Sequence, residues 1–420
     1  MVSVCFYFQV HQPFRVKKHS IFDIGKSSLD YFSDNSESNL NNEKIIKKVA
    51  QKCYLPTNSV LLELIKKYPN FKVSFSFSGV ILEQFEKYCP EVLSSFQELV
   101  KTGNVEILSE TYYHSLSFLY SKEEFREQIN LHKQLIQKIF AQTPKVFRNT
   151  ELIYNDELAK EIESLGFQGI LAEGHDYILG WRSPNLIYKP QGTTNMKLLL
   201  KNYRLSDDIA FRFSERSWQE WPLTAEKYAN WISAVNGSGN VVNLFMDYET
   251  FGEHQWAETG IFDFLRTLPE YIFKHPDNNF KTPSEVVESY PAVAELSIPF
   301  FVSWADIERD LSAWLSNSMQ HSAINKLFSL RNKVLSTKNP ELIAAWRKLQ
   351  TSDHFYYMCT KWFADGDVHK YFNPYESPYD AFISYMNVLH DLELKINAIN
   401  KEDIKKSLSL GLLDTKNSDN

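Results

Sequence analysis

The chain has 420 residues, 43% of them hydrophobic, and a formal net charge of −7, so we expect one large domain and a smaller one. The acidic balance, without a Lys/Arg cluster interleaved with aromatic residues, argues against a nucleic-acid partner. The four cysteines lack CxxC spacing, which favours reduced structural thiols over a zinc knuckle or disulfide framework. No basic leader and no run of 18 apolar residues is present, so we expect a cytoplasmic protein without a membrane partner.

Short β-rich runs alternate with helical patterns over about the first 300 residues. We expect strands at 2–10, 71–79, 104–108, 145–149, 167–174 and 240–247. A helix is expected at 121–140, opening with the capping-box pair Ser121 and Glu124, and another between Asn155 and Gly166. This alternation predicts an α/β fold with a parallel sheet, either open or closed into a barrel.

The pattern changes at about residue 303, where long amphipathic helices are expected. They cover 303–335 and 377–399, the second with Pro378 in its first turn. The C-terminal third is therefore predicted to be a helical unit, and residues 406–420 a flexible tail.

Polar clusters follow several of the expected strands, where the carboxyl ends of parallel strands meet ligands. The clusters are "HQPF" (11–14), "SETYYHS" (109–115), "NTE" (149–151) and "EGHDY" (173–177). Histidines and carboxylates could bind a metal, but there is no HExxH motif and no HxxH pair. Neutral polar groups mixed with aromatic rings such as Tyr177 and Tyr248 suit a hydroxyl-rich ligand better, although each ring alone is better explained by core packing.

The segment "MDYETFGEH" (246–254) directly follows a buried apolar run. At a strand period of two, Asp247 and Glu249 point to the same side, so each carboxylate would raise the pKa of the other. A carboxyl group that stays protonated near neutral pH is suited to general-acid catalysis. The alternative is a solvated loop that happens to be acidic.

The ordered series "HQPF", "GNVEILSETYYHS", "FRNTELIY", "DYETFGEHQW" and "TPSEV" resembles the five sequence regions of glycoside hydrolase family 57. This family includes certain α-amylases, 4-α-glucanotransferases and α-glucan branching enzymes. The stretches 204–214, 303–315 and 352–375 look like its α-amylase members. The resemblance implies an incomplete (β/α)7 barrel over residues 1–300 and an α-helical bundle over 301–405 that caps the active-site cleft.

The resemblance also implies residue roles. Glu151 matches the catalytic nucleophile and Asp247 the general acid/base of a retaining double displacement on an α-glucan. Arg148 lies close in sequence and would favour an ionised Glu151 if its guanidinium reached that carboxylate. Glu285 falls in the fifth region and has no assigned role, and neither a metal nor a cofactor is expected. The expected substrate contacts are His11, Gln12, His114, Trp181, Glu249, His254, Trp256, Asp353 and His354.

Two classes of function follow. The first is an α-glucan-active glycoside hydrolase of α-amylase type, with 4-α-glucanotransferase or branching activity as the alternative. The second is a non-catalytic glycan-binding protein on the same fold, and the presence of both Glu151 and Asp247 favours the enzyme. A metal-dependent carbohydrate hydrolase or deacetylase is a more remote reading.

Overall fold

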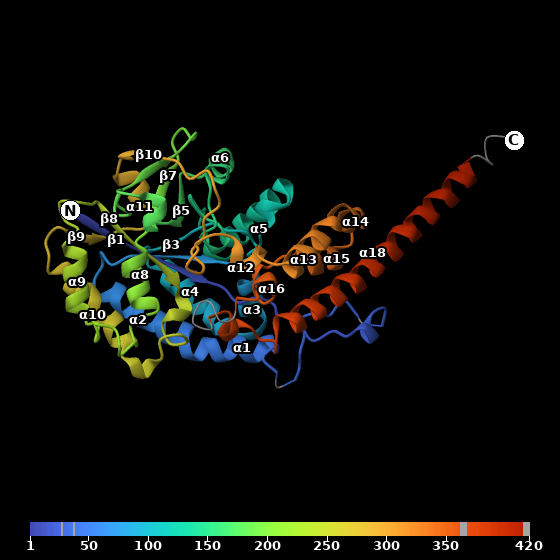
Figure 1. The fold of residues 1–420 in the computed structure, drawn as a ribbon, viewed down its shortest axis with the longest axis horizontal. Helices are drawn as coiled ribbons and strands as arrows, with labels where there is room; N and C mark the ends of the chain where they lie inside the picture. Colours follow the sequence, from blue (N-terminus) through green and yellow to red (C-terminus); the bar gives the residue numbers. More distant parts are fainter. Residues whose placement is uncertain (27, 37, 362–367, 415–420) are drawn as a thin grey trace. The chain divides into compact units, whose positions relative to one another are not determined.

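The computed structural model describes residues 1–420 except 27, 37, 362–367 and 415–420, and only the backbone of 402–414 (Figure 1). It divides into two compact units. The sheet unit comprises Met1–Gln12, Glu43–His114 and Lys122–Leu311. The helical unit comprises Pro13–Asn42, Ser115–Ser121 and Ser312–Asn420.

The sheet unit contains two sheets built mainly of parallel strands, which confirms the α/β fold. The first sheet has the order β3-β2-β1-β8, with β9 beside the start of β1, and every pairing in it is parallel. The second sheet has the order β10-β6-β7-β5-β4; β4, β5 and β7 are parallel, and β6 is antiparallel to β7. The strands are β1 (Val2–Val10), β2 (Val73–Phe77), β3 (Val105–Ile107), β4 (Val146–Arg148), β5 (Gly169–Glu173), β6 (Tyr188–Pro190), β7 (Lys197–Lys201), β8 (Val241–Asp247), β9 (Asn278–Phe280) and β10 (Ala294–Leu296).

Backbone hydrogen bonds join the two sheets at two seams. Beyond β3, the Ser109 amide donates to the Val146 carbonyl at 3.0 Å, and the Arg148 amide donates to the Ser109 carbonyl at 2.8 Å. Beyond β7, the Asn202 amide donates to the Asn243 carbonyl of β8 at 2.9 Å. An incomplete barrel of parallel strands requires hydrogen bonds of this kind between its two sheets. We interpret the arrangement as the expected (β/α)7 barrel.

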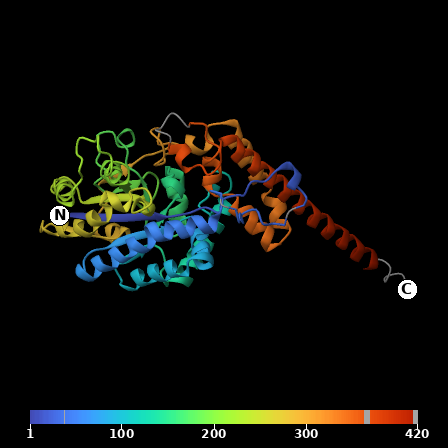
Figure 2. The ribbon, with the colours of Figure 1, turned by 90° about the horizontal axis from the view of Figure 1, so that it is seen from below.

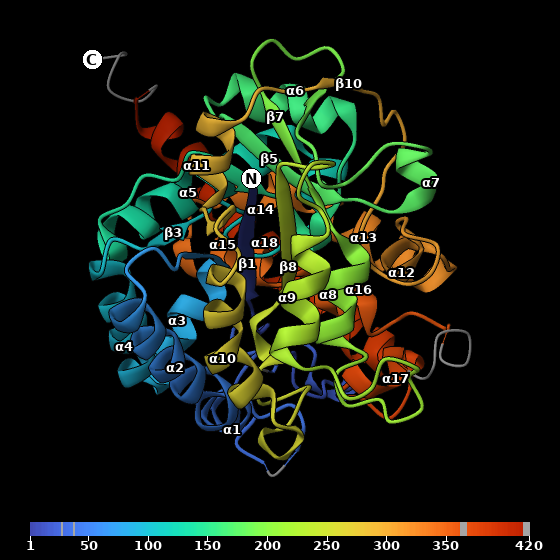
Figure 3. The same ribbon diagram turned by 90° about the vertical axis from the view of Figure 1, so that its left-hand side faces the viewer.

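Helices cover the strands of the sheet unit. The buried residues of β1 alternate between two apolar clusters, because both faces of the strand are covered (Figure 3). The Asn155 side chain caps the predicted helix at 156–164, accepting from the Leu158 amide at 2.9 Å. The helices are α1 (Asn42–Val49), α2 (Leu55–Lys67), α3 (Gly79–Tyr88), α4 (Pro90–Lys101), α5 (Lys122–Phe140), α6 (Asp156–Ser164), α7 (Asp176–Leu179), α8 (Tyr203–Ala210), α9 (Ala225–Ser233), α10 (Ile261–Phe273) and α11 (Pro283–Ser289).

The helical unit is built around α18, which packs against α13, α14 and α15 (Figure 2, orange and red). Residues 406–414, expected in a flexible tail, continue this helix, and 415–420 lie outside the described residues. The helices are α12 (Ser312–Leu315), α13 (Ser318–Ser329), α14 (Arg331–Ser336), α15 (Pro340–Lys348), α16 (Ser352–Tyr356), α17 (Val368–Phe372) and α18 (Pro378–Asp414).

The prediction of one long helix over 303–335 is wrong. Residues 303–311 are not helical and belong to the sheet unit, and the remainder forms α12, α13 and α14. Asp306 and Arg309 adopt left-handed backbone conformations, with φ of 55° and 52°, which interrupt a right-handed helix. The helix-like spacing of apolar residues in 303–311 therefore belongs to an irregular segment and not to a helix.

None of the described helices is both long and apolar enough to cross a membrane. The four cysteines are all buried and unpaired.

Candidate active site

Glu151 and Asp247 both lie at the carboxyl ends of parallel strands. Asp247 is the last residue of β8, and Glu151 follows β4. Glu151 and Leu152 have φ of 57° and 51°, a conformation that costs non-glycine residues on the order of 1–3 kcal/mol each. Neighbouring hydrogen bonds hold it: Leu152 donates to the Asn149 carbonyl at 3.0 Å, and the Trp304 amide donates to the Glu151 carbonyl at 3.2 Å. The fold thus fixes the backbone that presents Glu151.

Both carboxylate oxygens of Glu151 have donors. Oε1 lies 3.0 Å from Nε2 of His114, and Oε2 accepts from the indole Nε1 of Trp304 at 2.8 Å. The other ring nitrogen of His114 lies 2.9 Å from Oε2 of Glu110. Burial alone would lower the pKa of His114, but its hydrogen bonds to Glu110 and Glu151 outweigh burial and raise the pKa to about 9. His114 is therefore a cation between two carboxylates at neutral pH.

Glu110 and His11 support His114. Burial would raise the pKa of Glu110, but the hydrogen bond from His114 and the charge of that ring lower it to about 2. Gln9 of β1 donates to Glu110 Oε1 at 2.9 Å. The His11 ring stacks on His114 with centroids 4.0 Å apart, and its Nδ1 lies 2.6 Å from the Ser78 hydroxyl. His11 and His114 are thus brought together beside Glu151.

Asp247 has the opposite electrostatic environment. Burial, and next the negative charge of Glu151, raise the pKa of Asp247 to about 6, against the opposing charge of Arg148. The raised pKa agrees with our expectation, but its main charged cause is Glu151 and not Glu249. The guanidinium of Arg148 makes no hydrogen bond to Glu151; it lies over the Trp304 ring, 4.8 Å from the centroid, while His114 and Trp304 donate to Glu151, so an effect of its charge on Glu151 stays a prediction.

Glu249 is buried and does not belong to a solvated loop. Its side chain is 3% exposed and accepts a hydrogen bond from the Tyr54 hydroxyl. β8 ends at Asp247, and Tyr248–Thr250 form a 3-10 turn, so the strand period that we used for Glu249 does not extend to it. Burial, and then the charge of Asp247, raise the pKa of Glu249 to about 8. Tyr248 is fully buried, which leaves core packing as its role.

Two of the other expected substrate contacts, Gln12 and His254, lie beside Glu249. Gln12 interacts with Glu249, and the amide of His254 donates to the Glu249 carbonyl at 3.0 Å. Trp181 and Trp256 are 88% and 59% exposed, and a cationic side chain lies over each ring: Arg182 at 5.2 Å from the Trp181 centroid and Lys52 at 5.9 Å from the Trp256 centroid.

Asp353 and His354 lie on α16 of the helical unit, and their contact with substrate stays a prediction. His354 is buried there, with Nε2 at 3.2 Å from the Lys348 carbonyl.

Glu285 has a structural explanation. It completes the capping box of α11 by accepting from the Thr282 amide at 3.0 Å, and it pairs with Lys72. Lys72 directly precedes β2, so this pair lies at the amino edge of the first sheet, opposite the edge at which β8 presents Asp247. Sequence reasoning left the role of Glu285 open, and these contacts separate it from the candidate site.

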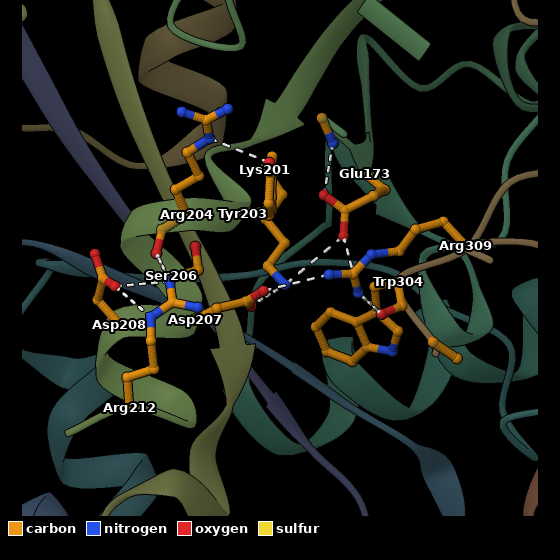
Figure 4. A network of polar contacts seen from close by, with 12 residues as sticks. Glu173, Lys201, Tyr203, Arg204, Ser206, Asp207, Asp208, Arg212, Trp304 and Arg309 are labelled. Atoms are coloured by element: carbon orange, nitrogen blue, oxygen red, sulfur yellow. Dashed lines mark hydrogen bonds and ion pairs between the residues drawn. The ribbon is translucent and has the colours of Figure 1, made fainter. Parts of the chain in front are cut away.

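Trp304 and a buried charge network were missed by sequence reasoning. Lys201 of β7 donates to Asp207 of α8 at 2.9 Å and lies 3.7 Å from Glu173 of β5 (Figure 4). Arg309 lies 3.3 Å from Asp207 and 3.7 Å from Glu173, and also donates to the Trp304 carbonyl. The position of Glu173 and Lys201 at strand ends could have indicated this network from the sequence. Trp304 and Arg309 could not be recognised, because they lay in a segment expected to be helical.

The positions of the His, Cys, Asp and Glu side chains bear on whether a metal ion could be bound. Within residues 1–420 outside the gaps, no group of three or more His, Cys, Asp or Glu side chains is placed to hold a metal ion. The histidine and carboxylate groups near Glu151 instead pair with one another.

Comparison with known proteins identifies the family. The family model for glycosyl hydrolase family 57 matches residues 5–299. A Methanocaldococcus jannaschii protein that carries a provisional α-amylase name is 46% identical over 407 residues, which covers 94% of this chain and 85% of that protein. An α-amylase of Pyrococcus furiosus is 25% identical over 253 residues, 59% of this chain and 37% of its own length.

Solved structures agree on the fold. The branching enzyme of Pyrococcus horikoshii superposes with a TM-score of 0.62 at 14% identity, covering 88% of this chain and 87% of that one. The 4-α-glucanotransferase of Thermococcus litoralis gives 0.61 at 19% identity, covering 84% and 56%. Fold and sequence together define a glycosidase. The chain belongs to glycosyl hydrolase family 57.

Proposed function

We propose that the protein is a retaining α-glucan-active hydrolase of α-amylase type that cleaves α-1,4-glucosidic bonds by double displacement. The observation that carries this is the contrast between two carboxyl groups. Glu151 accepts from cationic His114 and from Trp304, whereas the pKa of Asp247 is raised to about 6. A nucleophile must be ionised and an acid protonated, and these surroundings favour those states.

In the first step, an oxygen of Glu151 forms a bond to the anomeric carbon while the bond to the leaving glycosidic oxygen breaks. The proton of Asp247 passes to that oxygen, and the released sugar leaves as a neutral alcohol. In the second step, Asp247 takes a proton from water, whose oxygen displaces Glu151 and restores the original configuration. Retention predicts a separation of about 5–5.5 Å between the two carboxyl groups.

The alternative is a 4-α-glucanotransferase or branching enzyme of the same family. It follows the same first step, but a sugar hydroxyl replaces water in the second. The T. litoralis 4-α-glucanotransferase, 25% identical over 58% of this chain, supports keeping this candidate. A non-catalytic glycan-binding protein is more remote, because neither carboxyl group would then need a special environment. We also propose that the protein is cytoplasmic, as expected from the sequence.

Incubation with maltoheptaose, followed by product sizing and proton NMR, tests the proposal. We expect shorter maltooligosaccharides whose newly formed reducing ends appear first as the α-anomer. Products longer than the substrate would favour transfer, and β-anomers would overturn the retaining mechanism. Binding of maltoheptaose without any product would favour the non-catalytic glycan-binding hypothesis.

A further inference from the structure

Trp304 contacts Glu151 through both its backbone and its side chain. The Trp304 amide donates to the Glu151 carbonyl at 3.2 Å, and its indole Nε1 donates to Oε2 of the carboxylate at 2.8 Å. The amide contact adjoins the left-handed turn at Glu151 and Leu152. One residue therefore restrains both the unusual backbone and the orientation of the carboxyl group.

The charge network shown in Figure 4 restrains Trp304 in turn. Arg309 donates to its carbonyl, and Arg309 is bound at 3.3 Å to Asp207, which also pairs with Lys201. Lys201 and Arg148 lie over the indole ring, 5.5 and 4.8 Å from its centroid. Cations over an indole attract its electron-rich face. A buried group with charged contacts on several sides has few alternative arrangements.

We propose that Trp304 is a positioning residue for Glu151, fixing the second carboxylate oxygen while His114 fixes the first. The inference rests on the proposed function, in which Glu151 is the nucleophile. An indole N–H donates but cannot accept a proton near neutral pH, so it stabilises the ionised form and leaves the carboxylate unprotonated. Held from two directions, the carboxylate cannot rotate away from the anomeric carbon.

The charged groups that face Glu151 come from several elements. His114 follows β3 and Asp247 ends β8, while Arg148 of β4 and Lys201 of β7 lie over the Trp304 ring. The substitution Trp304→Phe leaves all four in place. It keeps an aromatic ring for the two cations and removes only the N–H donor and part of the ring.

The first test does not depend on catalysis. Glutamate labelled with carbon-13 at Cδ allows the ionisation of Glu151 to be followed by NMR, with Glu151→Gln assigning its signal. We expect Trp304→Phe to raise the pKa of Glu151 by about one unit, because one hydrogen bond to the charged form is lost. An unchanged titration in a folded Trp304→Phe variant would overturn the proposal.

The control is Trp346→Phe in α15. Trp346 is fully buried, and its indole Nε1 donates to the Leu327 carbonyl at 2.9 Å, so the same type of bond is lost in the helical unit. We expect the titration of Glu151 to stay as in the wild type. An equal shift in both variants would mean that general loosening is responsible, which also overturns the proposal.

Kinetics on maltoheptaose provide the second test. We expect Trp304→Phe to lower kcat roughly 10- to 100-fold with a KM change of less than about threefold, and to move the acid limb of kcat/KM upward. If Trp304→Phe does not fold, Arg309→Lys, which keeps the charge but changes the contact with the Trp304 carbonyl, should shift the same limb less. A wild type without glucan activity would refute the proposed function, while the NMR titration still decides the role of Trp304.

Discussion

The surroundings of Glu151 and Asp247 differ although each residue stands at the carboxyl end of a parallel strand. Around Glu151, a cationic imidazole and an indole donate to the two carboxylate oxygens. Around Asp247, burial and the charge of Glu151 raise the pKa to about 6. The difference teaches that strand-end position brings two acids together, but the neighbouring side chains decide which one holds a proton.

Replacing Glu151, the proposed nucleophile, should have the largest effect. We expect Glu151→Gln to lower kcat by roughly 10⁴-fold or more on maltoheptaose, because an amide cannot form the glycosyl ester. Glucan binding, measured by calorimetry, should stay nearly unchanged. Glu285→Gln is the matched control, since it changes an acid at the opposite edge of the first sheet, and its kcat should change by less than about threefold.

Replacing Asp247, the proposed acid, should have the next largest effect. We expect Asp247→Asn to lower kcat roughly 10²- to 10⁴-fold on maltoheptaose, and far less on an aryl α-glucoside whose leaving group needs no protonation. The ratio of the two losses measures the acid role. Equal losses on both substrates would contradict that assignment.

Removing the cation beside Glu151 should have a smaller effect. His114→Asn is expected to lower kcat roughly 10- to 100-fold and to move the acid limb of kcat/KM upward, because a positive charge no longer favours the ionised carboxylate. His11→Asn removes the stacked ring without touching Glu151, and it should act mainly on KM. An acid limb that stays in place in His114→Asn would show that the imidazole does not tune Glu151.

Substitution of Glu249 should have the smallest effect on activity. Because the pKa of Asp247 is raised to about 6 in the protein without substrate, its proton is held below that pH and lost above it, so the alkaline limb of kcat/KM should lie near pH 6. Glu249 has a pKa raised to about 8 and is itself protonated there. Glu249→Gln should therefore leave this limb within about half a unit and kcat within about threefold. A large downward shift of the limb would restore Glu249 as the group that tunes Asp247.

Much of the sheet unit could be predicted because its signal is local. Apolar runs predicted the strand that precedes Glu151 and the strand that ends at Asp247, and Asn155 marked the start of α6. The family resemblance then indicated the roles of the two acids, which the geometry makes testable.

The contacts of Trp304 could not be predicted, since they depend on tertiary structure. Residues 303–311 have helix-like apolar spacing, but Asp306 and Arg309 adopt left-handed conformations, and Arg309 is held by Asp207 about a hundred positions away. Glu249 was misread for a related reason. A period of two holds only while the strand continues, and the 3-10 turn after Asp247 ends it.

The two seams between the sheets affect the distance between Glu151 and Asp247. Asp247 belongs to the first sheet and Glu151 follows the second, and the sheets are joined by main-chain bonds at Ser109 and Asn243. The separation of the two carboxyl groups therefore depends on how the two sheets are joined and not on either sheet alone. Asn243 is fully buried and donates to the Leu200 carbonyl at 2.9 Å across one seam. A substitution of Asn243 can therefore change the distance between Asp247 and Glu151 while both of these side chains stay the same.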